Sequence, residues 1–200
     1  MVKTVKNNPE THLIILLIDE FILAENNRID LFNLMDIKET IERQIAYNTA
    51  IAEEGLRGDY GANIGRVLLA TYGDSVMVRA KAKAAAGSDA RMNGCELPVV
   101  INSGSGNQGM TTSLPVIEYA KELGVDHDTL LRALVVANLI TIHQKTSIGR
   151  LSAFCGAVSA GAGAGAGIAY LLDGSYDVIK HTIVNALGNV SGIVCDGAKS

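Results

Sequence analysis

The sequence contains no tryptophan and, among its 200 residues, only three phenylalanines and six tyrosines. A core without large rings has to be filled by Ala, Gly, Leu, Ile and Val. Ala, Leu, Ile and Val account for most of the 48% of residues that are apolar, and there are 21 Gly besides. That share is enough to bury a sizeable core in one domain, or in one domain plus part of another. Small side chains at this density favour helices that pack with their backbones close together.

The sequence also lacks a run of Lys or Arg, and its net charge is −4. A nucleic acid is therefore not expected as a partner, whereas a small polar or anionic substrate remains compatible with the charge. The three cysteines are odd in number and far apart, and the apolar run Leu13–Ile18 is too short for a secretory signal. These features argue against a disulfide framework and predict a protein of the reducing cytoplasm.

One long segment carries no charge, Leu151 to Leu172, and it is long enough to span a membrane. Much of it is Gly, Ala and Ser, which gain little from lipid, so a buried core helix is the better prediction. Its repeat, Gly161 to Gly167, alternates as in a silk-like strand, but the flanks make the run too long for a strand. In a helix each Gly costs roughly 1 kcal/mol relative to Ala, so very close packing must compensate.

The remaining pattern predicts a mainly α fold with at most a few short strands. Candidate strands are His12–Ile18 and Leu97–Ile101. The helices are expected at Asp36–Glu54, ended by Gly55 and Gly58; at Ile64–Ala86, interrupted at Gly73-Asp74 and broken at Gly87–Asp89; at Ser113–Lys121; at Asp128–His143, capped by Asp126; at Leu151–Leu172; and at Tyr176–Leu187.

A glycine-rich stretch reads Asn102, Ser103, Gly104, Ser105, Gly106, Asn107, Gln108, Gly109 and is predicted to be a loop. It contains G-x-G-x-x-G after a candidate strand, as a dinucleotide-binding fold requires, but a helical segment stands where the second strand should follow. Its backbone N–H groups and polar side chains can instead hold a carboxylate or phosphate beside a helix start. An ordinary glycine-rich turn is the alternative.

Four further residues have the chemistry of a site. Cys155 and Cys195 are candidate metal ligands, although a lone Cys on an apolar face is often a small buried hydrophobe, and no C-x-x-C suggests zinc. His143 and Lys145 stand at a helix end, where they can serve as a proton carrier and an anion anchor or simply favour the helix dipole.

Several segments in this order resemble the L-cysteine desulfidase and L-serine dehydratase alpha-chain-like family of iron–sulfur lyases. They are AIAEEGLRGDYG (residues 50–61), SDARMNG (88–94), NSGSGNQG (102–109), HQKTSIGRLSAFCGAV (143–158) and SGIVCDGAK (191–199). The resemblance covers about residues 50–200. It is specific for the family and much less so for the substrate, which is either cysteine or serine.

The resemblance implies an oxygen-sensitive, pyridoxal-free lyase with a [4Fe–4S] cluster held by three Cys, two of which match Cys155 and Cys195. A third ligand is implied beyond Ser200, and an N-terminal Gly-Cys-Thr motif has no counterpart, so these 200 residues alone are expected to hold no intact cluster. The implied reaction releases sulfide or water and then ammonia, leaving pyruvate. The loop (Asn102–Gln108) would face Cys155 and Cys195 and bind the substrate, and His143 or Lys145 would act as the base.

The same resemblance predicts an organisation in which residues 1–40 connect to a missing N-terminal region and residues 41–200 form a helical catalytic core, shortened at its C-terminus. Besides the amino-acid substrate, the expected partners are further copies of the chain or a complementary chain that carries the missing segments. A catalytically silent helical assembly module, which keeps the fold without the cluster, is the alternative function. Cys95 has no expected role at the cluster.

Overall fold

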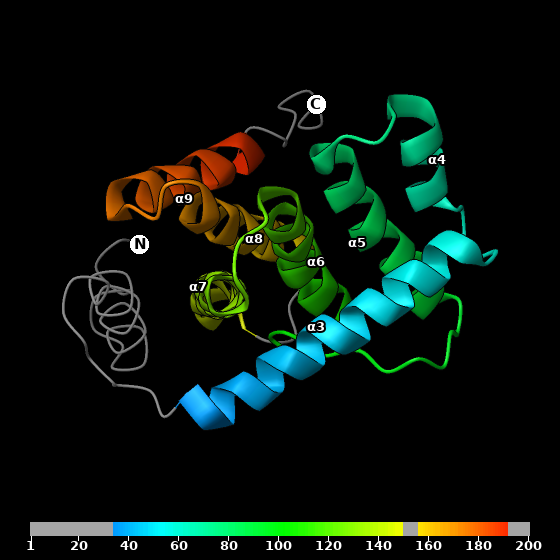
Figure 1. Cartoon of the computed structure of the whole chain (residues 1–200), viewed down its shortest axis with the longest axis horizontal. Helices are drawn as coiled ribbons and strands as arrows, with labels where there is room; N and C mark the ends of the chain where they lie inside the picture. The colour runs from blue at the N-terminus through cyan, green and yellow to red at the C-terminus, as the bar shows by residue number, and fades with distance from the viewer. Residues whose placement is uncertain (1–33, 150–155, 192–200) are drawn as a thin grey trace, which may run out of the picture.

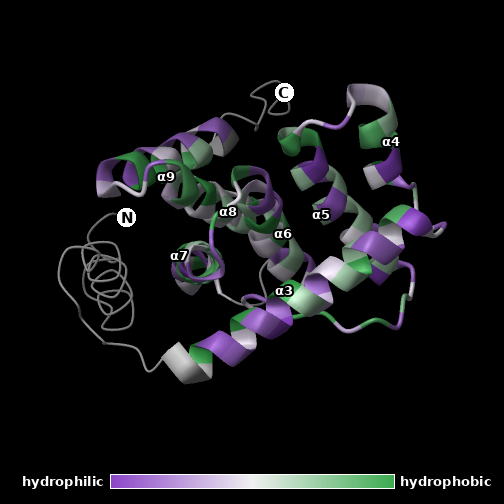
Figure 2. Ribbon diagram, in the orientation of Figure 1, coloured by the Kyte–Doolittle hydropathy of each residue, from purple (hydrophilic) through white to green (hydrophobic). Residues whose placement is uncertain are grey.

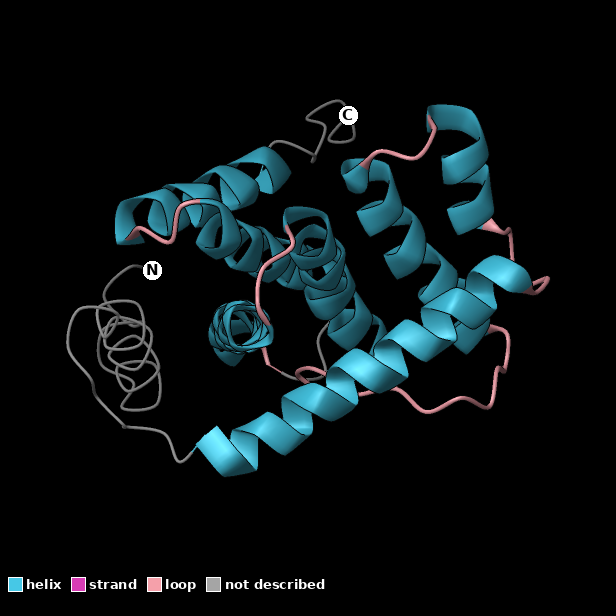
Figure 3. Ribbon diagram, in the orientation of Figure 1, coloured by secondary structure: helices cyan, strands magenta, loops and turns pink. Residues whose placement is uncertain are grey.

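The structure is a computed structural model that describes residues 34–149 and 156–191. Within these ranges the chain forms helices and no strand (Figure 3), which confirms the predicted mainly α fold class. The helices are α3 (Leu34–Arg57), α4 (Ile64–Tyr72), α5 (Val76–Met92), α6 (Gly106–Leu123), α7 (His127–Ile148), α8 (Gly156–Leu172) and α9 (Tyr176–Ser191). The candidate strand Leu97–Ile101 is an extended loop, and His12–Ile18 lies outside the described residues.

The long helix α3 crosses one side of the molecule and packs against α5, α6 and α7 (Figure 1). Its hydrophobic positions interrupt a largely polar ribbon (Figure 2), and Ile41 and Ile51 are buried, as the helical spacing predicts. Of the two glycines predicted to end this helix, Gly58 is confirmed, because α3 ends at Arg57, and Gly55 is wrong, because it lies inside the helix. Gly55 instead allows α5 to approach: a Cβ there would lie 2.1 Å from the carbonyl oxygen of Ala86.

The interruption predicted at Gly73-Asp74 is confirmed, since it separates α4 from α5. The break predicted at Gly87–Asp89 is wrong, because α5 continues to Met92. Gly87 is buried, and a Cβ on it would lie 2.7 Å from the sulfur of Met110 on α6. In both α3 and α5, a glycine taken as a helix terminator proves to be a point of close helix contact.

Helix α6 begins seven residues earlier than the prediction from Ser113 and Pro115, which lie inside it. Its first turn is therefore made of the glycine-rich segment itself. The next helix agrees with the sequence: Asp126 caps α7, and its carboxylate accepts a hydrogen bond of 2.8 Å from the backbone N–H of Thr129.

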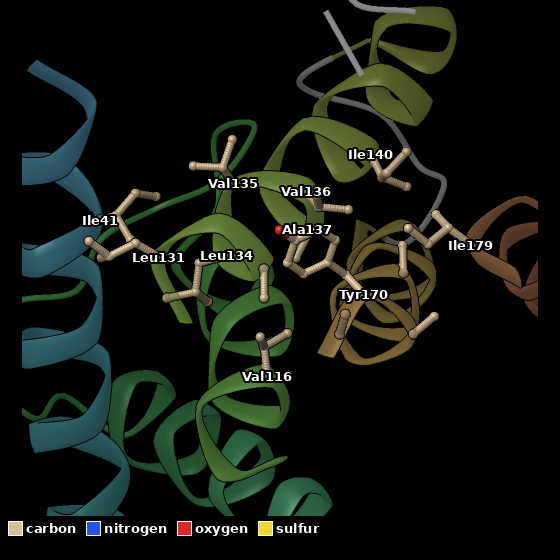
Figure 4. Packing of buried hydrophobic residues seen from close by; sticks show 14 of the residues in the cluster. Ile41, Val116, Leu131, Leu134, Val135, Val136, Ala137, Ile140, Tyr170 and Ile179 are labelled. Atoms are coloured by element: carbon tan, nitrogen blue, oxygen red, sulfur yellow. The ribbon is translucent and has the colours of Figure 1, made fainter. Parts of the chain in front are cut away.

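The larger hydrophobic core lies between α3, α6, α7, α8 and α9. Figure 4 shows α7 contributing most of its side chains, among them Leu134, Val136 and Ile140, with Tyr170 of α8 and Ile179 of α9 packed against them. A second, smaller cluster joins α3, α5 and α6 around Ile51 and Met110. Because α6 contributes to both clusters, it links the two halves of the fold.

The Gly/Ala-rich helix α8 packs as closely as its composition demands. A Cβ on Gly163 would lie 2.1 Å from Oγ1 of Thr141 and 2.5 Å from the carbonyl oxygen of Ala137. A Cβ on Gly167 would lie 2.9 Å from the carbonyl oxygen of Ala133. The predicted helix is confirmed from Gly156 onward and is largely buried between Ser159 and Tyr170, whereas Val158 and Leu172 are exposed; residues 151–155 lie outside the described part. None of the described helices has the length and apolar character needed to cross a membrane.

Candidate functional site

A tight turn at Asn102–Ser105 directly precedes α6. The backbone N–H of Asn102 donates to the carbonyl of Ser105 at 3.2 Å, and the N–H of Ser105 donates back at 3.1 Å. Ser103 and Gly104 both have positive φ, 48° and 94°, as a two-residue turn of this hand requires. The predicted loop is thus confirmed as far as Ser105, whereas its second half, Gly106–Gly109, is the first turn of α6.

The strand-like segment before this turn is held by Asn48 of α3. The backbone N–H of Val100 donates to Oδ1 of Asn48 at 2.9 Å, and Nδ2 of Asn48 donates to the carbonyl of Val100 at 3.2 Å and to Oγ of Ser113 at 3.1 Å. A Cβ on Gly109 would lie 2.0 Å from that same carbonyl oxygen. The segment is therefore fixed between α3 and α6 by one buried amide and one glycine.

A second set of amides ties the turn to α7. Nδ2 of Asn102 donates to Oδ1 of Asn138 at 2.8 Å, and Asn138 exchanges two hydrogen bonds of 2.8 and 3.1 Å with the amide of Gln44. Nδ2 of Asn138 also donates to the backbone carbonyl of Leu134 at 2.8 Å. Two helices, α3 and α7, and the turn thus meet in one amide network.

The first turn of α6 lies directly against the start of α8. A Cβ on Gly156 would lie 1.5 Å from Nε2 of Gln108, so the Gln108 side chain occupies the space beside this glycine. Farther along the same pair of helices, a Cβ on Gly167 would lie 2.9 Å from Val116. The two helices are therefore roughly parallel, with their starts adjacent.

Helix α7 runs the opposite way between them. Oγ1 of Thr112 and Oγ1 of Thr141 are 3.2 Å apart, and Gly163 packs on Thr141 while Gly167 packs on Ala133. Lys145 follows Thr141 by one turn and lies on the same face of α7. The last turns of α7, the first turn of α6 and the start of α8 therefore lie at one end of this helix trio.

Buried polar atoms without a hydrogen-bond partner concentrate in two of the segments singled out above. Six such side-chain atoms occur in the described part of the chain: Oγ1 of Thr49, Oδ1 of Asn102, Oε1 of Gln108, Nδ1 of His143, and Nε2 and Oε1 of Gln144. Five of the six belong to the glycine-rich segment or to the stretch His143–Lys145. Native proteins satisfy most buried polar groups, so these atoms call for a partner such as ordered water or a ligand.

The charged and basic side chains of the α7 end are largely removed from water. Lys145 is only 3% exposed. His143 is half-buried, and desolvation lowers the pKa of its imidazole below the usual value, which favours the neutral ring near pH 7. A neutral imidazole can accept a proton, as a general base must.

Not every predicted residue of the loop turns toward this end. Oδ1 of Asn107 accepts a hydrogen bond of 3.0 Å from Arg91 of α5, and a Cβ on Gly106 would meet the same arginine at 2.5 Å. Ser103 and Ser105 are half-buried and Gly104 is exposed. The structure therefore separates Gln108 and Asn102, whose amide oxygens are unpartnered, from Asn107, which is used in packing on α5.

The predicted metal ligands Cys155 and Cys195 lie outside the described residues, so their convergence with the loop stays a prediction. Cys155 directly precedes Gly156, the residue that packs on Gln108. Within the described ranges no three His, Cys, Asp or Glu residues are grouped as metal ligands. The space beside Gly156 is filled by the Gln108 side chain, whose amide oxygen has no hydrogen-bond partner.

The sequence analysis missed Gln44, Asn48, Asn138 and Gln144. A signal for two of them was present: Gln44 and Asn48 interrupt the apolar stripe of α3 between Ile41 and Ile51 at helical spacing. Both side chains are at most 2% exposed. A polar amide at a core position is retained when it has a specific partner, here the loop and Asn138.

Comparison with known proteins finds similar bacterial proteins, among them several UPF0597 proteins. It is 69% identical over 170 residues to a UPF0597 protein of Desulfitobacterium hafniense, covering 85% of this chain and 40% of that protein. It is 63% identical over 186 residues to one of Lachnoclostridium phytofermentans (92% and 45%), and 49% identical over 192 residues to one of Fusobacterium nucleatum (92% and 45%).

The chain thus spans less than half the length of these relatives. No solved structure matches it significantly. The family described as serine dehydratase alpha chain matches residues 12–200, nearly the whole sequence. The chain belongs to the serine dehydratase alpha-chain family, a membership that indicates a lyase-like role.

Proposed function

We propose that this chain forms part of the catalytic core of an amino-acid lyase, which converts L-cysteine to pyruvate, ammonia and sulfide, or L-serine to pyruvate, ammonia and water. The observation that carries the proposal is the concentration of unpartnered buried polar atoms in Asn102, Gln108, His143 and Gln144. These residues lie in the two segments that resemble the family's substrate loop and the stretch before its cluster cysteine. Membership of the family supports the same reaction class.

In this proposal His143 removes the proton from the substrate α-carbon, since burial lowers the pKa of the imidazole and keeps the ring in the neutral form that can accept a proton. The electron pair released from that C–H bond forms a double bond to the β-carbon, and the β-carbon–sulfur or β-carbon–oxygen bond breaks with its electrons. The resulting enamine becomes an imine, and water then hydrolyses the imine to pyruvate and ammonia.

Lys145 and the backbone at the start of α6 would bind the substrate carboxylate. The ammonium group of Lys145 is buried at this end of the helix trio, where charge interactions are less screened than in water. The N–H groups in the first turn of a helix are free of intrahelical partners and carry partial positive charge. Both features favour an anion over a neutral group.

Cys155 and Cys195 would hold a [4Fe–4S] cluster in the complete protein, together with a third ligand from outside these residues. Thiolates are the ligands that iron–sulfur clusters prefer, and such a cluster with an open iron position supplies a Lewis acid for the leaving group. The Gln108 side chain, which lies against Gly156 at the start of α8, would be a polar neighbour of such a group.

The test uses the complete protein, produced and assayed without oxygen. We expect pyruvate from L-cysteine or L-serine, together with bound iron and sulfide in a constant ratio. Cys155→Ser and Cys195→Ser should each remove cluster and pyruvate formation together. Cys95→Ser is the matched control, because Cys95 packs in the second core cluster beside Tyr60, and it should keep both.

Three results would contradict the proposal. Full activity of Cys155→Ser or Cys195→Ser would refute their role as ligands. A complete protein that contains iron but forms no pyruvate from either amino acid would refute the reaction. A complete protein with neither iron nor pyruvate formation would favour a silent helical assembly module instead.

A further inference from the structure

We propose that the side-chain oxygen Oδ1 of Asn102 accepts a hydrogen bond from the α-ammonium group of the substrate, and that Asn138 and Gln44 are positioning residues that orient it. This inference rests on the proposed function and assigns to Asn102 the opposite end of the amino acid from the carboxylate. It also gives a role to two amides, the buried Gln44 and the half-buried Asn138, that the elimination chemistry does not use.

The orientation of the Asn102 amide follows from a chain of hydrogen bonds that starts at the main chain. The carbonyl oxygen of Leu134 can only accept, so the group of Asn138 that faces it at 2.8 Å must be the NH₂ group. The remaining group of the Asn138 amide, which faces Asn102, is then the oxygen Oδ1, and it can only accept a hydrogen bond. Asn102 must present its own NH₂ group to this oxygen, at 2.8 Å.

A second contact gives the same orientation. Nδ2 of Asn102 lies 3.4 Å from the backbone carbonyl oxygen of Asn138, which again only accepts. Rotating the Asn102 amide by 180° would place its oxygen against two acceptors. Gln44 reinforces the arrangement, because its own amide pairs with both groups of Asn138.

Oδ1 of Asn102 is therefore an acceptor whose direction is fixed, and it has no partner. The residue is only 4% exposed, so bulk water does not satisfy this oxygen. An unpaired buried acceptor costs free energy on the order of 1–3 kcal/mol, which a ligand with a matching donor recovers on binding. A carboxylate has no donor, whereas an ammonium group has three hydrogens to donate.

The chain neighbours of Asn102 in the turn are more exposed than Asn102 itself. Ile101 before Asn102 is exposed, and Ser103 after it is half-buried. The acceptor thus belongs to a residue whose chain neighbours reach the surface, while its amide group is anchored to Asn138 of α7, which in turn pairs with Gln44 of α3. Such an anchored acceptor is pre-organised, and binding need not order it.

Two ligands that cannot undergo elimination test the assignment. L-Alanine and propionate differ only in the α-ammonium group, and neither carries a leaving group on its β-carbon. Binding of both is measured by calorimetry to the complete wild-type protein and to Asn102→Ala. We expect the substitution to weaken L-alanine about 10- to 100-fold, the range for one hydrogen bond to a charged group, and propionate less than about twofold.

Gln44→Leu is the companion variant, because it leaves Oδ1 of Asn102 in place and removes only part of its support. We expect a smaller loss of L-alanine affinity, with propionate again unaffected. If Asn102→Ala does not fold, as judged by circular dichroism, Asn102→Ser keeps a small polar side chain and is expected to show the same selective loss.

Equal weakening of L-alanine and propionate would overturn the inference, because it would mean a purely structural role for Asn102. An unchanged affinity of Asn102→Ala for L-alanine would also overturn the inference, because Oδ1 of Asn102 would then bind water rather than the ligand. So would a wild-type protein that binds neither ligand. Failure of the proposed function is distinguished by its own readout: selective loss of L-alanine without pyruvate formation from L-cysteine or L-serine supports the subsite and refutes the lyase.

Discussion

The side chain of Gln108 on α6 fills the space that a side chain on Gly156 of α8 would need, with Nε2 only 1.5 Å from the ideal Cβ position. This relationship joins residues 48 positions apart in the sequence. It also places an unpartnered amide oxygen of α6 next to the residue that follows the candidate ligand Cys155. Glycine at position 156 is therefore required by a neighbour of the proposed site.

Replacing Gly156 with Ala should displace the Gln108 side chain and lower the iron content and pyruvate formation of the complete protein at least tenfold. The glutamine can rotate away, so unfolding free energy should fall by no more than about 1–3 kcal/mol, the usual cost of overpacking. Gly161→Ala on the same helix is the control, because its Cβ would meet nothing within 4 Å. Equal iron content and activity in both variants would contradict the prediction.

Replacing Gly163 with Ala should destabilise the fold itself. The new Cβ would lie 2.1 Å from Oγ1 of Thr141 and 2.5 Å from the backbone carbonyl of Ala137, which cannot rotate away. We expect a loss of about 2–3 kcal/mol in unfolding free energy, measured by urea denaturation. Gly165→Ala, whose Cβ would meet only a methyl group of Thr182 at 3.4 Å, should instead be neutral or stabilising, and the opposite ranking would refute the packing described here.

Asn48→Ala should release the loop segment that begins at Val100. It removes three hydrogen bonds and leaves the buried backbone groups of Val100 unpaired, so a loss of about 2–4 kcal/mol in unfolding free energy is expected. Hydrogen exchange should rise at the N–H of Val100. The control is the adjacent Thr49→Val, which removes a buried hydroxyl that has no partner and should be neutral or stabilising. A stable Asn48→Ala protein would show that the clamp is dispensable.

The pH dependence should reflect the lowered pKa of His143. Burial disfavours the charged ring, so the folded protein keeps His143 neutral at pH values where the unfolded chain, with a pKa near 6.5, already binds a proton. Stability from this group is complete above that value and decreases as the pH falls below it. As the proposed base, His143 should keep kcat/KM constant down to below pH 6.5.

NMR titration of the His143 ring, assigned by comparison with His143→Gln, measures this pKa directly. The His143→Gln variant should also lose pyruvate formation by about 100-fold or more, the usual contribution of a general base. An acid limb of the kcat/KM profile that survives unchanged in an active His143→Gln protein would assign the base to another residue.

Helical periodicity was sufficient to predict the class of fold, because local spacing of apolar residues reports directly on the buried face of a helix. Ile41 and Ile51 on α3, the Asp126 cap of α7 and the uncharged α8 all follow from this signal. Glycine was the weak point. Gly55 and Gly87 were interpreted as helix ends, but a glycine inside a helix looks the same in sequence whether it ends the helix or admits a neighbour.

The amide network could not be predicted from the sequence either, because local patterns do not show which residues meet in the fold. Gln44 and Asn138 are 94 residues apart, and nothing local in the sequence indicates that their amides meet. Their polarity within apolar stripes shows that each needs a partner, but the identity of that partner depends on how α3 crosses α7.

The sequence by itself determined that the chain is helical, that α8 must pack closely, and which segments carry polar groups at unusual density, since propensity, side-chain volume and spacing are local properties. Only the tertiary structure decided which of those polar groups are satisfied. Asn107 is used by Arg91, whereas Asn102 and Gln108 keep unpartnered oxygens. The distinction depends on distances between helices far apart in the chain, and these are fixed by core packing rather than by any short motif.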